Sequence, residues 1–230
     1  MDDIIKNPFI KLREISKAAE KLCSSDCSRN LISVEEFLLR TNVLVKKLKD
    51  NSSLAPFLNE DYFPVFLPKI KAEGIGEATE EIFTFANEVA GDKIINRVGI
   101  AYNCFKITHY EALLSRLYTG NMVAIVFPSI FKKFSPDNQV EIIEKINNPC
   151  LIPQGPLEVS MAFSMYPDLF NQQHEYDLPA LRISDSNNRM KFPLFMKFYE
   201  EYNSYSLTIK LSHYGLMLGG ATFIEDGRLV

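Results

Sequence analysis

The segment GLMLGGAT, residues 215–222, has the spacing of a phosphate-binding loop, with two glycines five positions apart and a threonine at its end. Such a loop also needs a lysine after its second glycine and a helix whose amino terminus faces the phosphate. Ala221 follows Gly220 instead, and only eight residues follow the segment. We therefore expect no nucleotide here. Gly215, Gly219 and Gly220 are better explained as positions where two strands turn or bulge and a Cβ would collide.

A second kind of chemistry would use a cysteine nucleophile with a histidine base and an acidic group that orients it. The candidates are Cys104, His174, Asp177 and His213. Cys104 lies in YNCFK among large side chains, without the glycine-rich turn or helix start that lowers a thiol pKa. This setting is typical of a buried, inert cysteine. Neither GxSxG nor HExxH occurs, although two acids brought together by the fold would escape such a search. A thiol- or His/Asp-dependent hydrolase is therefore the alternative function.

Metal binding is not indicated by the cysteines and histidines. Cys23 and Cys27 are four positions apart and supply half of a zinc site at most. The next candidates, Cys104 and His109, have no spacing that pairs them with the first two. Four cysteines without a secretory leader favour reduced thiols in the cytosol. We expect no metal and no cofactor.

Composition and charge narrow the classes of partner. The 230 residues are 47% hydrophobic and carry a formal net charge of -4, with a pI near 5.5. Such a chain should fold and should not attract nucleic acid, which requires a broad cationic surface. The longest uncharged apolar stretches, 122–130 and 211–224, are shorter than the roughly 20 residues of a membrane-spanning helix. We expect a cytoplasmic protein with no membrane insertion and no nucleic acid.

Aromatic side chains supply candidates for a protein-binding surface. Residues 54–70, LAPFLNEDYFPVFLPKI, hold four aromatics and three prolines, more apolar material than a solvated connection needs. Aromatic anchors dominate protein interfaces, and prolines lower the entropy lost on binding. The candidate anchors are Tyr62, Phe63, Phe66, Tyr202 and Tyr205. The competing interpretation is that these aromatics belong to the core. We expect a non-catalytic binding or adaptor component of a larger cytosolic assembly, chaperone-like in character, whose partner is another protein.

The elements that would position these residues are helical in the amino-terminal half. Apolar residues recur at helical spacing over 9–22, 34–48, 78–89, 94–98 and 112–118. Ser33 with Glu36 and Thr108 with Glu111 form capping boxes before two of these stretches. The prolines of residues 54–70 predict an ordered loop or a string of turns.

In the carboxyl-terminal half the pattern changes. MVAIVF, 122–127, predicts a buried strand, and Ser135 with Pro136 predicts the start of a helix that ends before Pro149. Apolar residues alternate in LEVSMAFSM, 157–165, which predicts a strand with one apolar face. Shorter alternation predicts strands at 180–184 and 207–211. Asp226 and Gly227 predict a two-residue hairpin turn, and the apolar residues of 193–202 predict one more helix.

Together these elements predict an α+β fold. A helical amino-terminal half is followed by a small antiparallel sheet with packed helices in the carboxyl-terminal half. We expect residues 1–120 to be the helical region and residues 121–230 the α+β region, within one compact domain.

Overall fold

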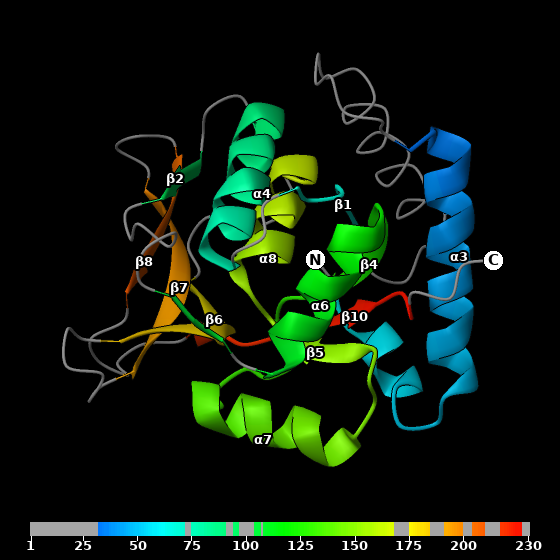
Figure 1. Cartoon of the computed structure of the whole chain (residues 1–230). Helices are drawn as coiled ribbons and strands as arrows, with labels where there is room; N and C mark the ends of the chain where they lie inside the picture. The colour runs from blue at the N-terminus through cyan, green and yellow to red at the C-terminus, as the bar shows by residue number, and fades with distance from the viewer. Residues whose placement is uncertain are drawn as a thin grey trace.

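The chain folds into helices and two β-sheets, a mixed α+β architecture (Figure 1). The computed structural model describes residues 32–71, 75–90, 94–96, 104–106, 108–167, 175–184, 191–199, 204–209 and 217–226. Several predictions lie outside these ranges: the helix at 9–22, Cys23 and Cys27, His174, Tyr202, His213 and Gly215, and the second residue of the hairpin at Asp226 and Gly227. No helix within the described ranges is long and apolar enough to cross a membrane.

Helix α3, Val34–Asp50, begins directly after Ser33, the predicted cap residue. The Ser33 hydroxyl accepts a hydrogen bond from the backbone N–H of Glu36 at 3.1 Å. This bond satisfies a donor that the first helical turn leaves unpaired. The buried face of α3 carries Phe37, Thr41, Leu44 and Leu48.

Three more helices match their predicted stretches. They are α4 (Ile75–Ala90), α6 (Thr108–Thr119) and α7 (Pro136–Ile146). Ser135 caps α7 through the backbone N–H of Asn138, with Pro136 in the first turn, as its sequence predicts. The helix ends at Asn147, which adopts the left-handed conformation that asparagine tolerates.

The predicted strand at 157–165 is wrong, because this segment is helix α8, Pro156–Met165. Gly155 precedes the helix, and its backbone N–H donates to the Glu158 carboxylate at 2.6 Å. All ten residues are buried. α8 lies near the centre of the molecule and contacts α4 and strands of both sheets (Figure 1). A helix buried on every side needs no polar stripe, so it lacks the period that reveals an amphipathic helix.

The first sheet has the order β1-β4-β10-β5 with antiparallel neighbours. Its strands are β1 (Phe63–Leu67), β4 (Met122–Phe127), β5 (Leu151–Pro153) and β10 (Ala221–Ile224). β4 matches its predicted bounds and is buried along its whole length. β1 pairs along its length with β4, so segments from both halves of the chain form one sheet and share one hydrophobic core.

Strand β1 corrects the prediction that residues 54–70 hold only loop and turns. The segment begins with a short 3-10 helix, η1 (Ala55–Asn59), and continues into β1. Proline is tolerated here because β1 is an edge strand in the sheet order. The Pro64 carbonyl accepts a hydrogen bond from the Tyr166 hydroxyl at 2.6 Å, and the Phe66 N–H faces the Met165 sulfur at 3.5 Å. The end of α8 thus covers this edge of the sheet.

The second sheet has the order β2-β8-β7-β6-β3, with β9 added beside β6. Its strands are β2 (Ile94–Asn96), β3 (Cys104–Lys106), β6 (Glu175–Ser184), β7 (Lys191–Tyr199), β8 (Ser204–Ile209) and β9 (Met217–Leu218). β6 and β8 fall on the predicted strands. β2 and β7 replace the helices predicted at 94–98 and 193–202. Aromatic residues dominate β7, and they fit a pleated, half-buried surface as readily as a helix face. The register shifts between Leu178 and Arg182, opposite Leu194 and Pro193.

Candidate functional site

A chain of aromatic rings runs from the core of the first sheet to the surface. The Tyr62 ring lies 6.2 Å from that of Phe127, which lies 5.6 Å from Phe57. Phe57 continues to Phe131 at 6.4 Å, and Phe131 to Phe134 at 6.4 Å. Most of these pairs meet edge to face, a favoured arrangement of aromatic rings. We call these five residues the aromatic chain. Phe127 and Phe131 are buried, Phe57 and Tyr62 are half-buried, and Phe134 is 47% exposed.

Phe134 lies on a turn that three hydrogen bonds hold in place. The N–H of Phe131 donates to the Gly219 carbonyl at 2.9 Å, and the N–H of Phe134 donates to the Phe131 carbonyl at 3.2 Å. The Phe134 carbonyl in turn accepts from the side-chain amide of Gln139 at 3.1 Å. Lys133, between these bonds, has a φ of 72°. A lysine in the left-handed region is uncommon and persists where the surroundings impose it.

The predicted partner-binding residues divide by their exposure. Tyr62 and Phe63 are half-buried, and burial raises the pKa of the Tyr62 hydroxyl. Phe66 is fully buried and packs on Phe85 with ring centres 6.5 Å apart, so it offers no surface to a partner. Tyr205 lies in β8 opposite Phe198, and the positions of their side chains are outside the described structure.

Sequence reasoning missed Phe134, the most exposed aromatic ring of the aromatic chain. The signal available was FKKF, residues 131–134, in which two lysines separate two phenylalanines just before a capped helix. Lys132 and Lys133 are exposed beside Phe134.

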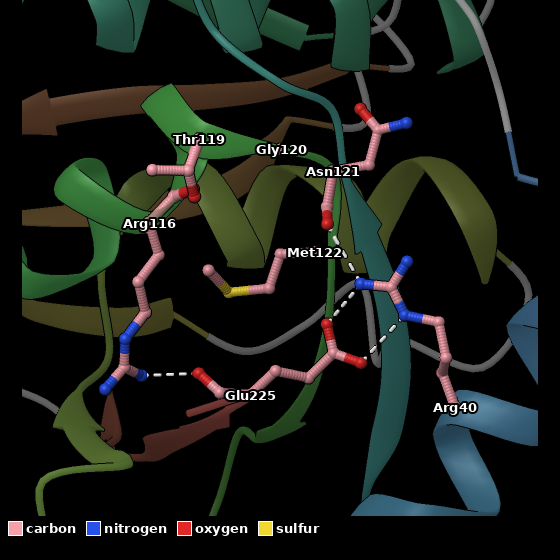
Figure 2. A pocket seen from close by; sticks show the side chains of 7 residues that line it. All are labelled: Arg40, Arg116, Thr119, Gly120, Asn121, Met122 and Glu225. Atoms are coloured by element: carbon pink, nitrogen blue, oxygen red, sulfur yellow. Dashed lines mark hydrogen bonds and ion pairs between the residues drawn. The ribbon is translucent and has the colours of Figure 1, made fainter. Parts of the chain in front are cut away.

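A second feature is a pocket of about 200 Å³ between two arginines, at the other end of β4 (Figure 2). Arg40 of α3 and Arg116 of α6 form opposite walls, and Glu225, just after β10, lies across between them. Thr119, at the end of α6, and Met122, at the start of β4, line the rest together with the two residues between them.

Glu225 holds both arginines in place. Its carboxylate accepts two hydrogen bonds from the Arg40 guanidinium, which also donates to the Asn121 carbonyl at 2.9 Å. The Glu225 backbone carbonyl accepts from Arg116 at 2.5 Å. The backbone N–H of Val123 donates to the same carboxylate at 2.9 Å. The hydrogen bond with Glu225 raises the pKa of Arg40 above its ordinary value, although burial opposes the rise.

Cys150 lies close enough to Arg116 for the arginine charge to act on its thiol. Burial raises the pKa of its thiol, and the positive charge of Arg116 only partly offsets that rise. A raised pKa lowers the fraction of nucleophilic thiolate at neutral pH. This environment does not activate Cys150 as a nucleophile.

A third feature is a set of buried polar side chains around Gly219 and Gly220. The Gln139 amide donates to the Asp177 carboxylate at 3.3 Å. The other amide atom of Gln139 and both polar atoms of the Gln154 side chain are buried, with no hydrogen-bond partner in the described part of the chain. A Cβ on Gly219 would collide with Gln139, and one on Gly220 with Gln154 and the Phe127 carbonyl. The prediction that these glycines stand where a Cβ would collide is confirmed.

The residues of the hydrolase alternative are only partly located. Asp177 is buried on β6, against α7. Cys104 lies in β3 opposite Ile183, six residues from Asp177 along β6, which corresponds to roughly 15 to 20 Å at the rise of a strand. His174 and His213 are outside the described residues. The described part of the structure therefore does not bring Cys104 and Asp177 together.

Segment 215–222 forms strands in its described part, since β9 precedes Gly219 and β10 follows Gly220. Among the described side chains, no three histidine, cysteine, aspartate or glutamate residues are grouped as metal ligands. Comparison of the chain with protein-family models, with curated proteins and with solved structures found no significant match.

Proposed function

We propose that this chain is a non-catalytic protein-binding component of a cytosolic assembly, and that it binds its partner through the exposed end of the aromatic chain. The observation that carries the proposal is the display of Phe134 on a turn fixed by Gly219 and Gln139. A large ring held in one position loses little entropy on binding, which is the property of an anchor residue.

The rest of the aromatic chain supports this role. Phe131 and Phe57 lie beneath Phe134 and connect it to the core through Phe127. A partner side chain placed on Phe134 would therefore press on a packed surface and not on a loose loop. Anchor residues of interfaces are typically set in well-packed surroundings of this kind.

The neighbouring charges define the partner's chemistry. Lys132 and Lys133 are exposed beside Phe134. A partner segment with an apolar side chain for Phe134 and acidic side chains for the two lysines would complement this surface. Charge pairs at the rim of an interface mainly raise the association rate, and salt weakens them.

The test is a comparison of Phe134→Ala with Leu39→Ala. Leu39 is 65% exposed on α3, so its replacement removes a similar exposed apolar side chain from another surface. Proteins retained from cytosol by the wild-type chain should be lost or weakened at least tenfold with Phe134→Ala and kept with Leu39→Ala. Lys132→Glu should weaken binding of the same partner. It should also reduce the loss of binding that added salt causes.

Two outcomes would overturn the proposal. Retention of every partner by Phe134→Ala would remove this surface from consideration. Loss of the partner with Leu39→Ala alone would move the binding surface to α3. Sedimentation of the purified chain distinguishes a second copy from a different protein as the occupant, because self-association through Phe134 would disappear in Phe134→Ala.

A further inference from the structure

The pocket between Arg40 and Arg116 lies well away from the aromatic chain. Met122 lines the pocket and Phe127 belongs to the aromatic chain, and the two stand at opposite ends of β4. At the rise of a strand they are about 17 Å apart. A ligand in this pocket would therefore be independent of the protein partner proposed above.

Arg116 is the cation of the pocket that pairs with no carboxylate among the described residues. Arg40 forms ion pairs with both Glu225 and Glu36, whereas Arg116 donates to a backbone carbonyl. The carboxyl-terminal end of α6 carries about half a negative charge and offsets part of the Arg116 charge. An anion of modest affinity therefore suits the Arg116 side of the pocket.

Arg116 has donors to spare for such an anion. One of its N–H groups donates to the Glu225 backbone carbonyl. A guanidinium has five N–H donors, and no further acceptor meets Arg116 among the described residues. Arg40, by contrast, is committed to Glu225, Asn121 and Glu36. Two carboxylates offset its charge, so Arg40 forms a fixed wall of the pocket more than a source of free donors.

We propose that this pocket binds a small oxyanion, a phosphate or carboxylate group, with Arg116 as the principal donor and Arg40 as the opposite wall. Guanidinium groups match the paired oxygens of both anions. A volume of about 200 Å³ holds roughly six groups of the size of water, enough for inorganic phosphate or a short dicarboxylate. Glu225 positions both arginines and thereby fixes the separation of the two walls (Figure 2).

Gly120 offers a test that leaves both arginines in place. It lines the pocket, and a Cβ built on it meets no atom within 4 Å. Its φ also lies outside the left-handed region, so a side chain adds no backbone strain there. Gly120→Asp places a negative charge at the pocket, and Gly120→Asn is the neutral control of the same shape.

The experiment is an NMR titration of the full chain with inorganic phosphate, repeated with succinate, at constant ionic strength set with sodium chloride. We expect saturable shifts of the Gly120, Asn121 and Met122 amide signals with at least one anion, in the millimolar range. The dissociation constant should rise at least tenfold in Gly120→Asp and in Arg116→Gln, and stay within about twofold in Gly120→Asn. Saturation by phosphate alone assigns a phosphate site, and saturation by succinate alone assigns a carboxylate site.

Two results would overturn the proposal. Shifts that match those produced by sodium chloride alone would show only general screening. Unchanged binding in Gly120→Asp, with the variant folded, would place the anion elsewhere. Lys145→Gln serves as the charge control, because Lys145 is an exposed lysine on α7 that does not line the pocket.

Discussion

The Arg40 guanidinium and the Glu225 carboxylate form a two-point ion pair across 185 positions of the chain. The pair joins α3 to the segment that follows β10. Both side chains are largely removed from solvent, with 13% and 8% of their surfaces exposed. The same carboxylate accepts from the Val123 N–H at the start of β4, so one side chain ties a helix and two strands together.

We predict that Glu225→Gln lowers the free energy of unfolding by about 3 kcal/mol, because it removes the buried carboxylate of the Arg40 ion pair and leaves Arg40 only the exposed Glu36 as an ionic partner. The matched control is Glu141→Gln on α7, whose ion pair with Lys145 is exposed. An exposed pair is worth less than about 1 kcal/mol. Urea unfolding of both variants measures the difference. Equal, small losses would show that the buried pair contributes no more than a surface pair.

The two glycines after β9 lead to a second prediction. A Cβ at Gly220 would collide with the backbone carbonyl of Phe127 as well as with Gln154, and a backbone atom cannot move aside cheaply. We expect Gly220→Ala to cost about 1 to 3 kcal/mol or more as overpacking. Gly120→Ala should have a much smaller effect, since nothing lies within 4 Å of its added carbon.

Thermal and urea unfolding of these two alanine variants provide the measurement. The double variant Gly220→Ala with Gln154→Ala separates the two collisions, because it removes the side chain and leaves the Phe127 carbonyl. Recovery of full stability in the double variant would show that the backbone had yielded, against this prediction.

The elements that the sequence predicts correctly are those with one buried and one exposed face. α3 and α7 combine a side-chain cap with an apolar stripe, and the hydroxyls of Ser33 and Ser135 make the expected bonds. β4 was predictable for another reason, because a six-residue apolar run between Gly120 and Pro128 is too short for a helix.

The failure at α8 occurs where burial removes that contrast. In α8 small or polar residues alternate with larger apolar ones, which imitates a strand. The Ser160 and Ser164 hydroxyls nevertheless donate to carbonyls four residues earlier in the helix. Pro156 and Glu158 were visible signs of a helix start, with the proline in the first turn and the carboxylate on the Gly155 N–H. Alternation outweighed them in the sequence interpretation.

Neither candidate site could be assembled from the sequence. The pocket depends on Arg40, Arg116 and Glu225, whose separations in the chain carry no local signal. The sequence does not distinguish Phe134 from its many other aromatic residues. The turn that exposes Phe134 is held by Gly219 and Gln139, and Gly219 belongs to a distant segment of the chain. Long-range contacts of this kind become visible only once the strand order is known.

Tyr166 gives a prediction about alkaline pH. Burial raises the pKa of its hydroxyl well above the ordinary value of 10.0, and the hydroxyl donates to the Pro64 carbonyl. A folded-state pKa above the unfolded one means that the stabilisation is complete below pH 10 and is lost as the pH rises beyond it. We expect the free energy of unfolding to fall above pH 10, and to fall less steeply in Tyr166→Phe.

Tyr166→Phe should also lose about 1 kcal/mol at neutral pH, because the Pro64 carbonyl loses its buried donor. Chemical unfolding between pH 8 and 11 provides both numbers. Parallel curves for the wild type and the variant would mean that Tyr166 does not couple folding to pH.

The last prediction separates the buried aromatics of residues 54–70 from the exposed end of the aromatic chain. Phe66 is fully buried in β1 and packs on Phe85, so Phe66→Ala should cost about 3 to 5 kcal/mol of unfolding free energy. Phe134 keeps 47% of its surface exposed, and Phe134→Ala should cost less than about 1 kcal/mol. Tyr62→Ala should fall between them, because Tyr62 is half-buried against Phe127. Urea unfolding of the three variants gives this order directly. An anchor can be removed with little loss of stability and a core residue cannot, so a large loss in Phe134→Ala would place that ring in the core and leave the proposed binding surface without its anchor.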